Sequence, residues 1–205
     1  MYAVPQFDET RPELLRSLMS ENPLGTLIMQ GADGLAADHI PFEIDVHDRA
    51  PFGVLRAHVA RANPLLRNNG GQALVVFHGP SAYITPSLYE EKAVSGKVVP
   101  TWNYAAVHAH GTLRVVEDPA YLFALLERLT VRHEAARSLP WSIHDAPRAF
   151  IDKIMAAIVG IEIPIARLQG KWKLSQDHCE RDQRAIAAAS TAAMAAAMAA
   201  AGTSR

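Results

Sequence analysis

The chain has 205 residues, of which 49% are hydrophobic and 20% charged, with a formal net charge of −1. This composition is typical of a soluble globular domain, and the single cysteine, Cys179, excludes an internal disulfide framework. Dedicated nucleic-acid binders usually carry a basic excess, so DNA binding would require a local basic patch. No apolar run approaches about 18 residues, and no basic-then-apolar leader is present, so we expect a cytoplasmic protein without a membrane segment.

The first half of the chain is predicted to contain one short helix followed by strands. Thr10-Arg11-Pro12-Glu13 has the form of a capping box, which predicts a helix that ends at Asn22-Pro23. Strands are expected where β-favouring or alternating residues are bounded by turn residues. We place them at residues 25–29, 35–45 (bent at Pro41), 53–59, 73–77 (closed by Gly79-Pro80) and within 98–116 (interrupted near Gly111).

The second half is predicted to be mainly helical. Asp118-Pro119 and Asp145-Ala146-Pro147 each combine a capping residue with a proline near the helix start. The first helix has apolar residues at helical spacing from Leu122 to Leu129, and the second runs to about Ile158 and ends at Gly160. Residues 161–165 alternate as a strand. Residues 185–201 contain twelve alanines and are expected to be helical, as either a loosely docked tail or a partner-binding helix.

The order of these elements predicts a mainly β fold with flanking helices, of the α+β class. Strands come first, helices lie mainly at the ends and the turns between strands are short, which favours an antiparallel sheet closed into a small barrel. The glycine-rich signatures of Rossmann and P-loop nucleotide sites are missing from the sequence. We assign one domain to residues 1–182 and an alanine-rich C-terminal tail to residues 183–205.

The first candidate binding segment is the polar and aromatic run at residues 99–104. In an extended chain Thr101 and Asn103 face one way, and Trp102 and Tyr104 face the other. Such a strand offers hydrogen-bonding groups on one side and flat rings on the other, as a planar heterocyclic ligand requires. An aromatic pair that fills a core or a subunit interface would give the same pattern.

The second candidate segment is Gly170–Gln176. Alternation places Lys171, Lys173 and Ser175 on one side of an extended chain, and Trp172 and Leu174 on the other. Two cations and a hydroxyl at alternate positions suit a phosphate dianion. A solvated edge strand whose lysines discourage aggregation explains the pattern equally well.

Two further segments offer polar groups at strand ends. Arg61 and Asn63 follow a predicted strand and could hold an anion together with backbone amides, although an arginine near a turn is often only a surface residue. Residues 79–87 are rich in hydroxyls and stiffened by prolines, but hydroxyls also cap turns.

The nine histidines do not form a recognisable metal-binding pattern. His108-Ala109-His110 places two rings on one strand face, but His133-Glu134 lacks the second histidine of a zinc-binding helix and a set of thiolates is missing. We therefore predict no metal site. A Ser-His-Asp hydrolase is also disfavoured, since the sequence has no G-x-S-x-G motif.

Taken together, these segments resemble the PaiB family of FMN-binding negative transcriptional regulators, from Met1 to about Asp182. The stretches that carry the resemblance are Pro23-Leu24-Gly25-Thr26-Leu27, His39-Ile40-Pro41-Phe42, His58-Val59-Ala60-Arg61-Ala62-Asn63-Pro64, Gly79-Pro80-Ser81-Ala82-Tyr83-Ile84-Thr85-Pro86-Ser87, Val99-Pro100-Thr101-Trp102-Asn103-Tyr104, Pro140-Trp141, Val159-Gly160-Ile161-Glu162-Ile163-Pro164-Ile165 and Gly170-Lys171-Trp172-Lys173-Leu174-Ser175-Gln176. The order of so many stretches makes the resemblance specific.

The resemblance implies an antiparallel split β-barrel of the flavin-reductase and pyridoxamine-phosphate-oxidase type, and a homodimer with FMN at the subunit interface. It places the FMN phosphate near His58, Arg61 and Asn63, with Lys171 and Lys173 as further candidates. It places the ring system near Thr101, Trp102 and Asn103, with Trp172, Ser175 and Gln176 reaching in from the C-terminal segment, and it adds Tyr83 to the cofactor-binding residues.

The sequence departs from the family pattern at three positions. Leu88 and His110 stand where the family often has aromatic residues, and Asp177 stands where asparagine is usual. Leu88 could reshape the groove, and a carboxylate at Asp177 close to the phosphate would weaken anion binding.

Three functions follow from the resemblance. The first is an FMN-binding repressor with DNA as a partner, although the basic candidates Arg128, Arg132 and Arg137 also fit the solvated face of a helix. The second is an FMN-dependent oxidoreductase that uses a reduced nicotinamide donor. The third is a non-catalytic module that senses flavin or redox state. The sequence identifies no catalytic residue.

Overall fold

The computed structural model describes residues 1–2, 4–32, 34–46 and 52–202. The chain forms two compact units, each built from separate stretches of sequence. The first unit comprises Met1–Asn22, Phe77–His108 and Gln169–Arg205, and the second comprises Pro23–Val76 and Ala109–Leu168. No described helix combines the length and the apolar character needed to span a membrane.

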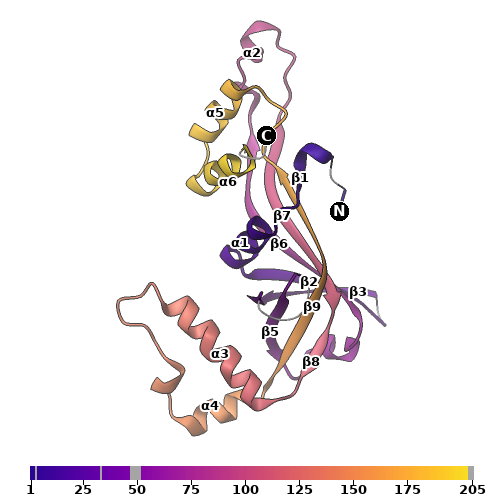
Figure 1. The fold of residues 1–205 in the computed structure, drawn as a ribbon, viewed down its shortest axis with the longest axis vertical. Helices are drawn as coiled ribbons and strands as arrows, with labels where there is room; N and C mark the ends of the chain where they lie inside the picture. Colours follow the sequence, from indigo (N-terminus) through magenta and orange to yellow (C-terminus); the bar gives the residue numbers. More distant parts are fainter. Residues whose placement is uncertain (3, 33, 47–51, 203–205) are drawn as a thin grey trace. The chain divides into compact units, whose positions relative to one another are not determined.

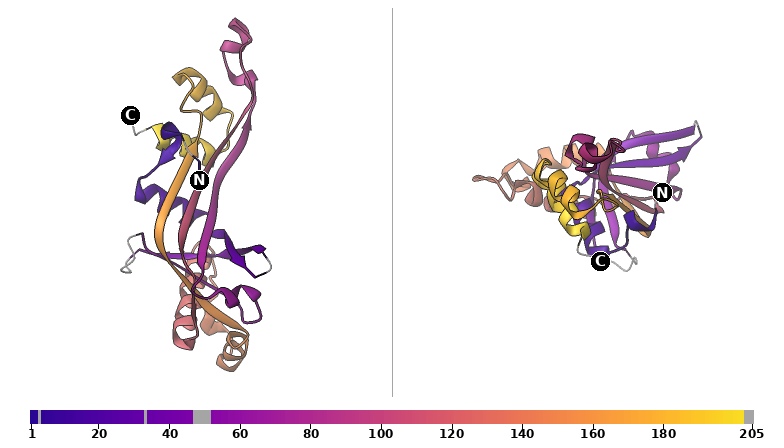
Figure 2. Two further views of the ribbon diagram at one scale, coloured as in Figure 1. Left: turned by 90° about the vertical axis from the view of Figure 1, so that its right-hand side faces the viewer. Right: turned by 90° about the horizontal axis from the view of Figure 1, so that it is seen from above.

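The first unit combines parts of three long strands with helices from both ends of the chain. Its strands are β1 (Asp8–Glu9) and parts of β6 (Gln72–Ile84), β7 (Thr101–Thr112) and β9 (Ile158–Lys173). Figures 1 and 2 show α1, α5 and α6 on the same side of these strands. The helical segments of this unit are η1 (Pro5–Phe7), α1 (Pro12–Glu21), η3 (Pro86–Leu88), α2 (Glu91–Val94), α5 (Glu180–Ala188) and α6 (Ala192–Gly202).

The second unit contains the shorter strands and two adjacent helices. Strands β2 and β3 form a hairpin in which Leu24 lies opposite Pro41, and β5 pairs antiparallel with β9. Helices α3 and α4 lie side by side in Figure 1. The elements of this unit are β2 (Leu24–Gly31), β3 (Gly34–Pro41), β4 (Glu43–Asp45), β5 (Val54–Ala60), η2 (Pro64–Asn68), β8 (Arg114–Val116), α3 (Pro119–Glu134), η4 (Ile143–Asp145) and α4 (Arg148–Met155), together with the remaining parts of β6, β7 and β9.

The described strands form a largely antiparallel sheet in the order β3-β2-β6-β7-β9-β5-β4, with β1 and β8 also paired to β9. This confirms the α+β class. The expectation of a closed barrel is wrong for the described strands, because the path ends at β3 on one side and at β4 on the other. Closure requires the two edge strands to pair, and β4, with three residues, offers few backbone groups for that.

Helix α3 begins as its sequence signal predicts, whereas α4 has Pro147 as its N-cap and is not capped by Asp145, which belongs to η4. The Asp118 carboxylate accepts a hydrogen bond from the Ala120 N–H at 2.8 Å, which confirms the predicted cap of α3. One core cluster joins the two helices, since Leu122 of α3 packs with Ile151 and Met155 of α4. Gly160 of β9 allows α3 to approach closely, because a Cβ atom there would lie 2.8 Å from the Tyr121 ring.

The start of α1 differs from the prediction. The N-cap residue is Arg11, and the Thr10 capping box does not form. Instead, the buried Glu9 carboxylate accepts hydrogen bonds from the Arg11 N–H and the Arg11 Nε, both at 2.9 Å. These hydrogen bonds outweigh the effect of burial and lower the pKa of Glu9. The start of the helix is therefore fixed by an ion pair rather than by a hydroxyl.

The alanine-rich segment is helical, as predicted, and its helices pack within the first unit. Met194 of α6 is 1% exposed, and the Arg11 Nη2 donates to the Ala200 carbonyl at 2.9 Å. Ile186 of α5 is fully buried in a cluster with Ile84 and Tyr89. In this structure the tail is docked rather than loose.

The remaining differences concern element boundaries. Strand β6 continues through Gly79-Pro80 to Ile84, and β9 continues past the predicted 161–165 to Lys173. The break between β7 and β8 falls at Leu113 rather than at Gly111, and α4 ends at Met155, before Ile158. The sheet environment overrides these local glycine and proline signals.

Candidate functional site

Two aromatic side chains stand exposed on neighbouring strands of the first unit. Tyr83 of β6 is 57% exposed and Trp102 of β7 is 52% exposed. Their ring centroids lie 6.3 Å apart, with the planes inclined at 62°. This edge-to-face pair exposes two aromatic rings, and exposed aromatic surface is typical of a binding site for a planar molecule or a partner.

Lys173 lies beside this pair and is anchored to β7. Its ammonium donates to the Trp102 carbonyl oxygen at 3.0 Å and to the Thr101 hydroxyl. The predicted residues Thr101, Trp102 and Lys173 are thus brought together by neighbouring strands. The contacts fix the position of the ammonium while leaving its charge without a carboxylate partner among the described residues.

Lys171 lies two residues earlier on β9, on the same side of the strand. Its Nζ donates to the Tyr2 carbonyl oxygen at 3.0 Å and lies 5.5 Å from the centre of the Tyr104 ring. As for Lys173, its contacts within the described part of the chain are to neutral groups. The two lysines give this strand two unneutralised positive charges.

Asn103 and Ser175 form a closed pair of hydrogen bonds in the interior of the first unit. They are 0% and 2% exposed. The Asn103 Nδ2 donates to the Ser175 Oγ at 2.9 Å, and the Ser175 hydroxyl donates back to the Asn103 Oδ1 at 3.0 Å. Ser175 has a φ of 65°, which ends the strand alternation, so its side chain does not join Lys171 and Lys173 as the pattern predicts.

Gln176 and Trp172 also make internal contacts. The Gln176 Oε1 accepts from the Leu174 N–H at 2.7 Å, and its Nε2 donates to the Trp172 carbonyl oxygen. Trp172 is 5% exposed and lines a groove beside α1 and α6. In this structure these residues shape the end of β9 rather than present side chains to the exposed aromatic pair.

The predicted phosphate residues Arg61 and Asn63 belong to the second unit and already have partners there. The Arg61 guanidinium pairs with the Glu117 carboxylate at 2.8 Å and donates to the carbonyl oxygens of Ala156 and Ile158, both at 3.2 Å. The Asn63 Oδ1 caps η2 by accepting from the Leu65 N–H at 2.9 Å. Arg61 is therefore neutralised by an acidic neighbour.

His58, the third predicted phosphate residue, lines a separate cavity of the second unit. The cavity measures about 510 Å³ and lies against α3. The Nδ1 atom of His58 is buried without a hydrogen-bond partner, and burial lowers the pKa of the ring. A histidine in these surroundings favours its neutral form, so it is a poor counter-ion for a phosphate.

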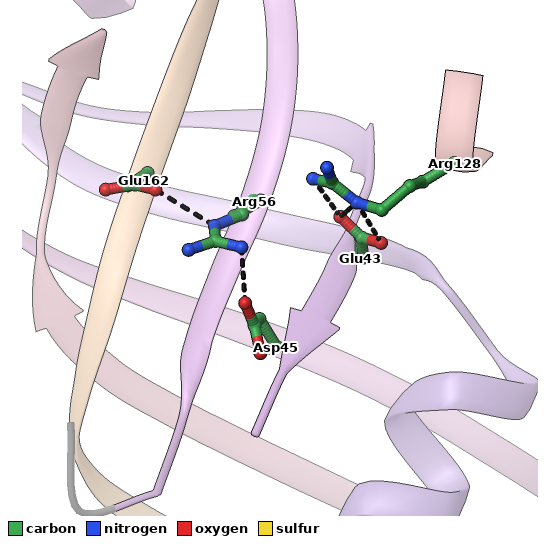
Figure 3. A network of polar contacts seen from close by, with 5 residues as sticks. All are labelled: Glu43, Asp45, Arg56, Arg128 and Glu162. Atoms are coloured by element: carbon green, nitrogen blue, oxygen red, sulfur yellow. Dashed lines mark hydrogen bonds and ion pairs between the residues drawn. The ribbon is translucent and has the colours of Figure 1, made fainter. Parts of the chain in front are cut away.

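A network of charged residues on β5, β4, β9 and α3 was not anticipated from the sequence. Arg56 of β5 donates from its Nε to Glu162 at 2.9 Å and also pairs with Asp45, as Figure 3 shows. Nearby, Arg128 of α3 binds both oxygens of Glu43. The register of β5 against β9 sets Arg56 opposite Glu162. The sequence alone does not show this register, so the ion pair could not be predicted from it. Within the described ranges, no group of three or more His, Cys, Asp or Glu side chains is arranged to hold a metal ion.

Comparison with known proteins identifies the family. Residues 1–167 match the family described as "Putative FMN-binding domain". A Bacillus subtilis relative, "Protease synthase and sporulation protein PAI 2", is 31% identical and aligns with 89% of this chain and 85% of its own. A relative from Emericella nidulans, "Uncharacterized protein AN0679", is 34% identical, with 91% and 88% covered.

Solved structures agree on the fold. The FAD and heme binding protein from Mycobacterium smegmatis has a TM-score of 0.58 and 22% identity, and the match covers 87% of this chain and 79% of that one. These findings confirm the split-barrel flavin-binding fold, the resemblance to PaiB and FMN as the cofactor of the family. The chain belongs to the Putative FMN-binding domain family.

Proposed function

We propose that this chain holds FMN on the first unit and acts as a flavin-responsive transcriptional regulator. The observation that carries the binding site is the exposed Tyr83–Trp102 pair beside the anchored ammonium of Lys173. Two rings give a planar isoalloxazine system an apolar surface to lie against. Thr101 and the β7 backbone beside it supply hydrogen-bonding groups at its edge.

The charges of the first unit suit the phosphate of FMN. Lys171 and Lys173 are compact cations, and each keeps at least one N–H group for an anion besides those it donates to Tyr2, Thr101 and Trp102. Neither forms an ion pair within the described part of the chain, so both charges are available to neutralise a dianion. At Arg61, by contrast, a phosphate would have to displace or adjoin the Glu117 carboxylate. This comparison supports the β9 lysines as the phosphate site.

The exposed aromatic pair also supports a homodimer. Exposing two large rings to water is unfavourable, and a second copy of the chain would cover them together with the ligand. In such a dimer each FMN would contact residues of both subunits. Bound FMN supplies a ring that can accept a hydride, and the residues of this chain bind and orient that ring.

The regulatory role is supported by the relative from Bacillus subtilis, whose name refers to protease synthase and sporulation. The near-zero net charge means that any contact with DNA would use a local surface. A flavin-dependent oxidoreductase and a flavin sensor that does not bind DNA are the competing functions, and the second experiment below separates them.

The first experiment measures FMN binding by flavin absorption after gel filtration. We expect the wild-type protein to retain FMN, and Lys171→Ala with Lys173→Ala to weaken binding by about tenfold or more, because charge-assisted phosphate contacts are lost. Trp102→Ala should also weaken binding. Lys153→Ala, at an exposed position on α4, is the matched control and should bind as the wild type does. Unchanged binding in the double variant would contradict the proposed phosphate site.

The second experiment uses FMN-loaded protein. A sequence-specific shift of its own promoter DNA at physiological salt, altered by FMN, would support the regulator. Bleaching of the flavin by NADH or NADPH without any DNA shift would instead identify an oxidoreductase, and FMN binding with neither result would leave the sensor.

A further inference from the structure

The cavity beside α3 is a second concave site, and it lies within the second unit. We call it the α3 cavity; its walls are one face of α3, the hairpin of β2 and β3, the strand β5 and Trp141. Its volume of about 510 Å³ is in the range of small-molecule sites, and it is a groove open to solvent rather than an enclosed cavity. Leu24 and Pro41 lie opposite each other on β2 and β3 and form one wall.

The helix contributes a stripe of side chains that the protein covers only in part. Leu126, Leu129, Thr130 and His133 follow the i, i+3, i+4, i+7 spacing and all line the cavity. Leu122 and Leu125, on the neighbouring stripe, are buried in the core, whereas Leu126 and Leu129 are only half-buried. Leu24 is 60% exposed and Trp141 is 46% exposed on the other walls. The cavity thus presents apolar surface that a ligand could cover.

His58 gives this apolar cavity a specific polar group. Its Nδ1 is buried and unpartnered, and burying an N–H without an acceptor is more costly than burying an unprotonated ring nitrogen. This assigns the proton of the neutral ring to Nε2. Because His58 lines the cavity, a ligand there could meet this N–H as a hydrogen-bond donor in a largely apolar lining.

Two carboxylates, those of Glu134 and Glu43, hold the walls in place. The Glu134 carboxylate accepts from the backbone N–H of Trp141 at 3.1 Å and from the Arg137 Nε at 3.1 Å, so the end of α3 carries the Trp141 wall. Arg128, between Leu126 and Leu129 in sequence, ties the helix to Glu43 of β4 through both of its oxygens. Hydrogen bonds and ion pairs therefore hold α3 and Trp141, which form two walls of the cavity, in place.

We propose that the α3 cavity binds a small, uncharged, planar aromatic molecule that accepts a hydrogen bond from the Nε2 of His58. The apolar walls and the Trp141 ring favour a flat aromatic body, and a ring carbonyl or ring nitrogen would accept the hydrogen bond. The basic groups lining the cavity are histidines alone, and the Glu134 carboxylate is already held by Arg137 and the Trp141 N–H, so the lining offers no permanent cation to a negatively charged ligand. Four of the stretches that resemble the PaiB family supply lining residues: Pro23 and Leu24, Pro41, His58, and Trp141. This site goes beyond the proposed FMN site, which uses residues of the first unit.

The test uses coumarin as the probe, since it is flat, uncharged and carries one carbonyl acceptor. We expect the FMN-saturated wild-type protein to bind coumarin in a calorimetric titration, and to bind coumarin-3-carboxylate at least tenfold more weakly. His58→Leu should weaken coumarin binding at least tenfold. His58→Gln, whose side-chain amide can donate from a similar position, should restore most of it.

Two controls keep this proposal separate from the FMN site. Tyr83→Ala should leave coumarin binding unchanged, and free FMN added to flavin-free protein should not displace coumarin. If FMN displaces the probe, or if Tyr83→Ala abolishes its binding, coumarin occupies the flavin site and the proposal fails. Equal binding by His58→Leu and the wild type would also overturn it.

Should His58→Leu fail to fold, the wild-type protein still decides the question. Intermolecular nuclear Overhauser effects between coumarin and the methyl groups of Leu24, Leu126 and Leu129 are expected. Their absence in protein that binds the probe would refute the assignment.

Discussion

At the scale of single residues, partners that are distant in sequence determine what a charged group can do. Arg61 and Lys173 are both basic, and both were predicted as phosphate contacts. Arg61 pairs with Glu117, whereas Lys173 contacts only a hydroxyl and a carbonyl among the described residues. The two positions look alike in a local reading of the sequence, because the neutralising carboxylate is contributed by a segment more than fifty residues away.

Among the arginines that form ion pairs, replacement of Arg56 is expected to lower the free energy of unfolding most. Its side chain is 17% exposed and holds Glu162 and Asp45, which are 20% and 24% exposed. Arg56→Met would leave two partly buried carboxylates without a cation, so we expect the free energy of unfolding to fall by about 2 kcal/mol. Denaturation with urea measures this change.

Arg184→Met is the matched control for Arg56→Met. Its pair with Glu180 is 3.9 Å long and both side chains are largely exposed. Such pairs contribute little, so the change should stay below about 0.5 kcal/mol. Equal losses at the two positions would show that the Arg56 network does not stabilise the fold.

His58 should make stability depend on pH. Burial lowers its pKa in the folded protein, whereas an unfolded chain has the ordinary histidine value of about 6.5. As the pH falls below that value, the unfolded state binds a proton that the folded state does not, so the contribution of His58 to stability is lost toward acid pH. The other titratable groups that line its cavity are His133 and Glu134.

The variant His58→Gln isolates this effect because glutamine does not titrate. Between pH 7.5 and 5.5, the unfolding free energy of the wild type should decrease relative to that of the variant, by at most about 1.4 kcal/mol per pH unit below 6.5. Urea denaturation across this range is the measurement. A difference that stays constant with pH would mean that His58 has the same pKa in both states.

At the scale of elements, the start of α3 was predictable from sequence, whereas the end of β6 was not. The start of α3 depends on Asp118 and Pro119, which act on the next few backbone groups, and the structure reproduces that cap. Strand β6 passes through Gly79 and Pro80, although such residues usually end strands. Its continuation depends on pairing with strands elsewhere in the chain, which no local window contains.

The candidate site was predictable from sequence only in part. Strand alternation correctly placed Lys171 and Lys173 on one side of β9. It could not anticipate the positive φ of Ser175, and therefore it grouped a buried hydroxyl with two half-buried ammonium groups. The closed hydrogen-bond pair with Asn103 joins residues 72 positions apart. Sequence spacing gives the direction of a side chain, but it does not reveal whether that side chain already has a partner.

The docked tail gives a prediction at the same scale. Met194 is 1% exposed, whereas Met198, one turn further along α6, is only half-buried. Met194→Ala should therefore destabilise the protein by about 2 kcal/mol and Met198→Ala by clearly less, because the larger loss of buried surface leaves the larger cavity. Thermal unfolding compares the two variants. If neither shifts the melting temperature, α6 does not contribute to stability.

At the scale of the whole molecule, compact units and chain order do not coincide. Strands β6, β7 and β9 each contribute residues to both units, so each unit is assembled from separate stretches. A domain boundary after residue 182, as predicted from composition, would not separate these units. It remains a prediction about the tail alone. Neither unit can be obtained by cutting the chain once.

The pairing of β1 with β9 has a consequence for biosynthesis. Asp8 and Glu9 pair with Lys171 and Gly170, so β1 and its partner segment are separated by most of the described residues. During translation β1 must wait until Gly170 and Lys171 have left the ribosome. Contacts of such long sequence separation slow folding, since the intervening loop must be closed first. Until that pairing forms, the backbone groups of β1 that pair with β9 stay without their partners in the nascent chain.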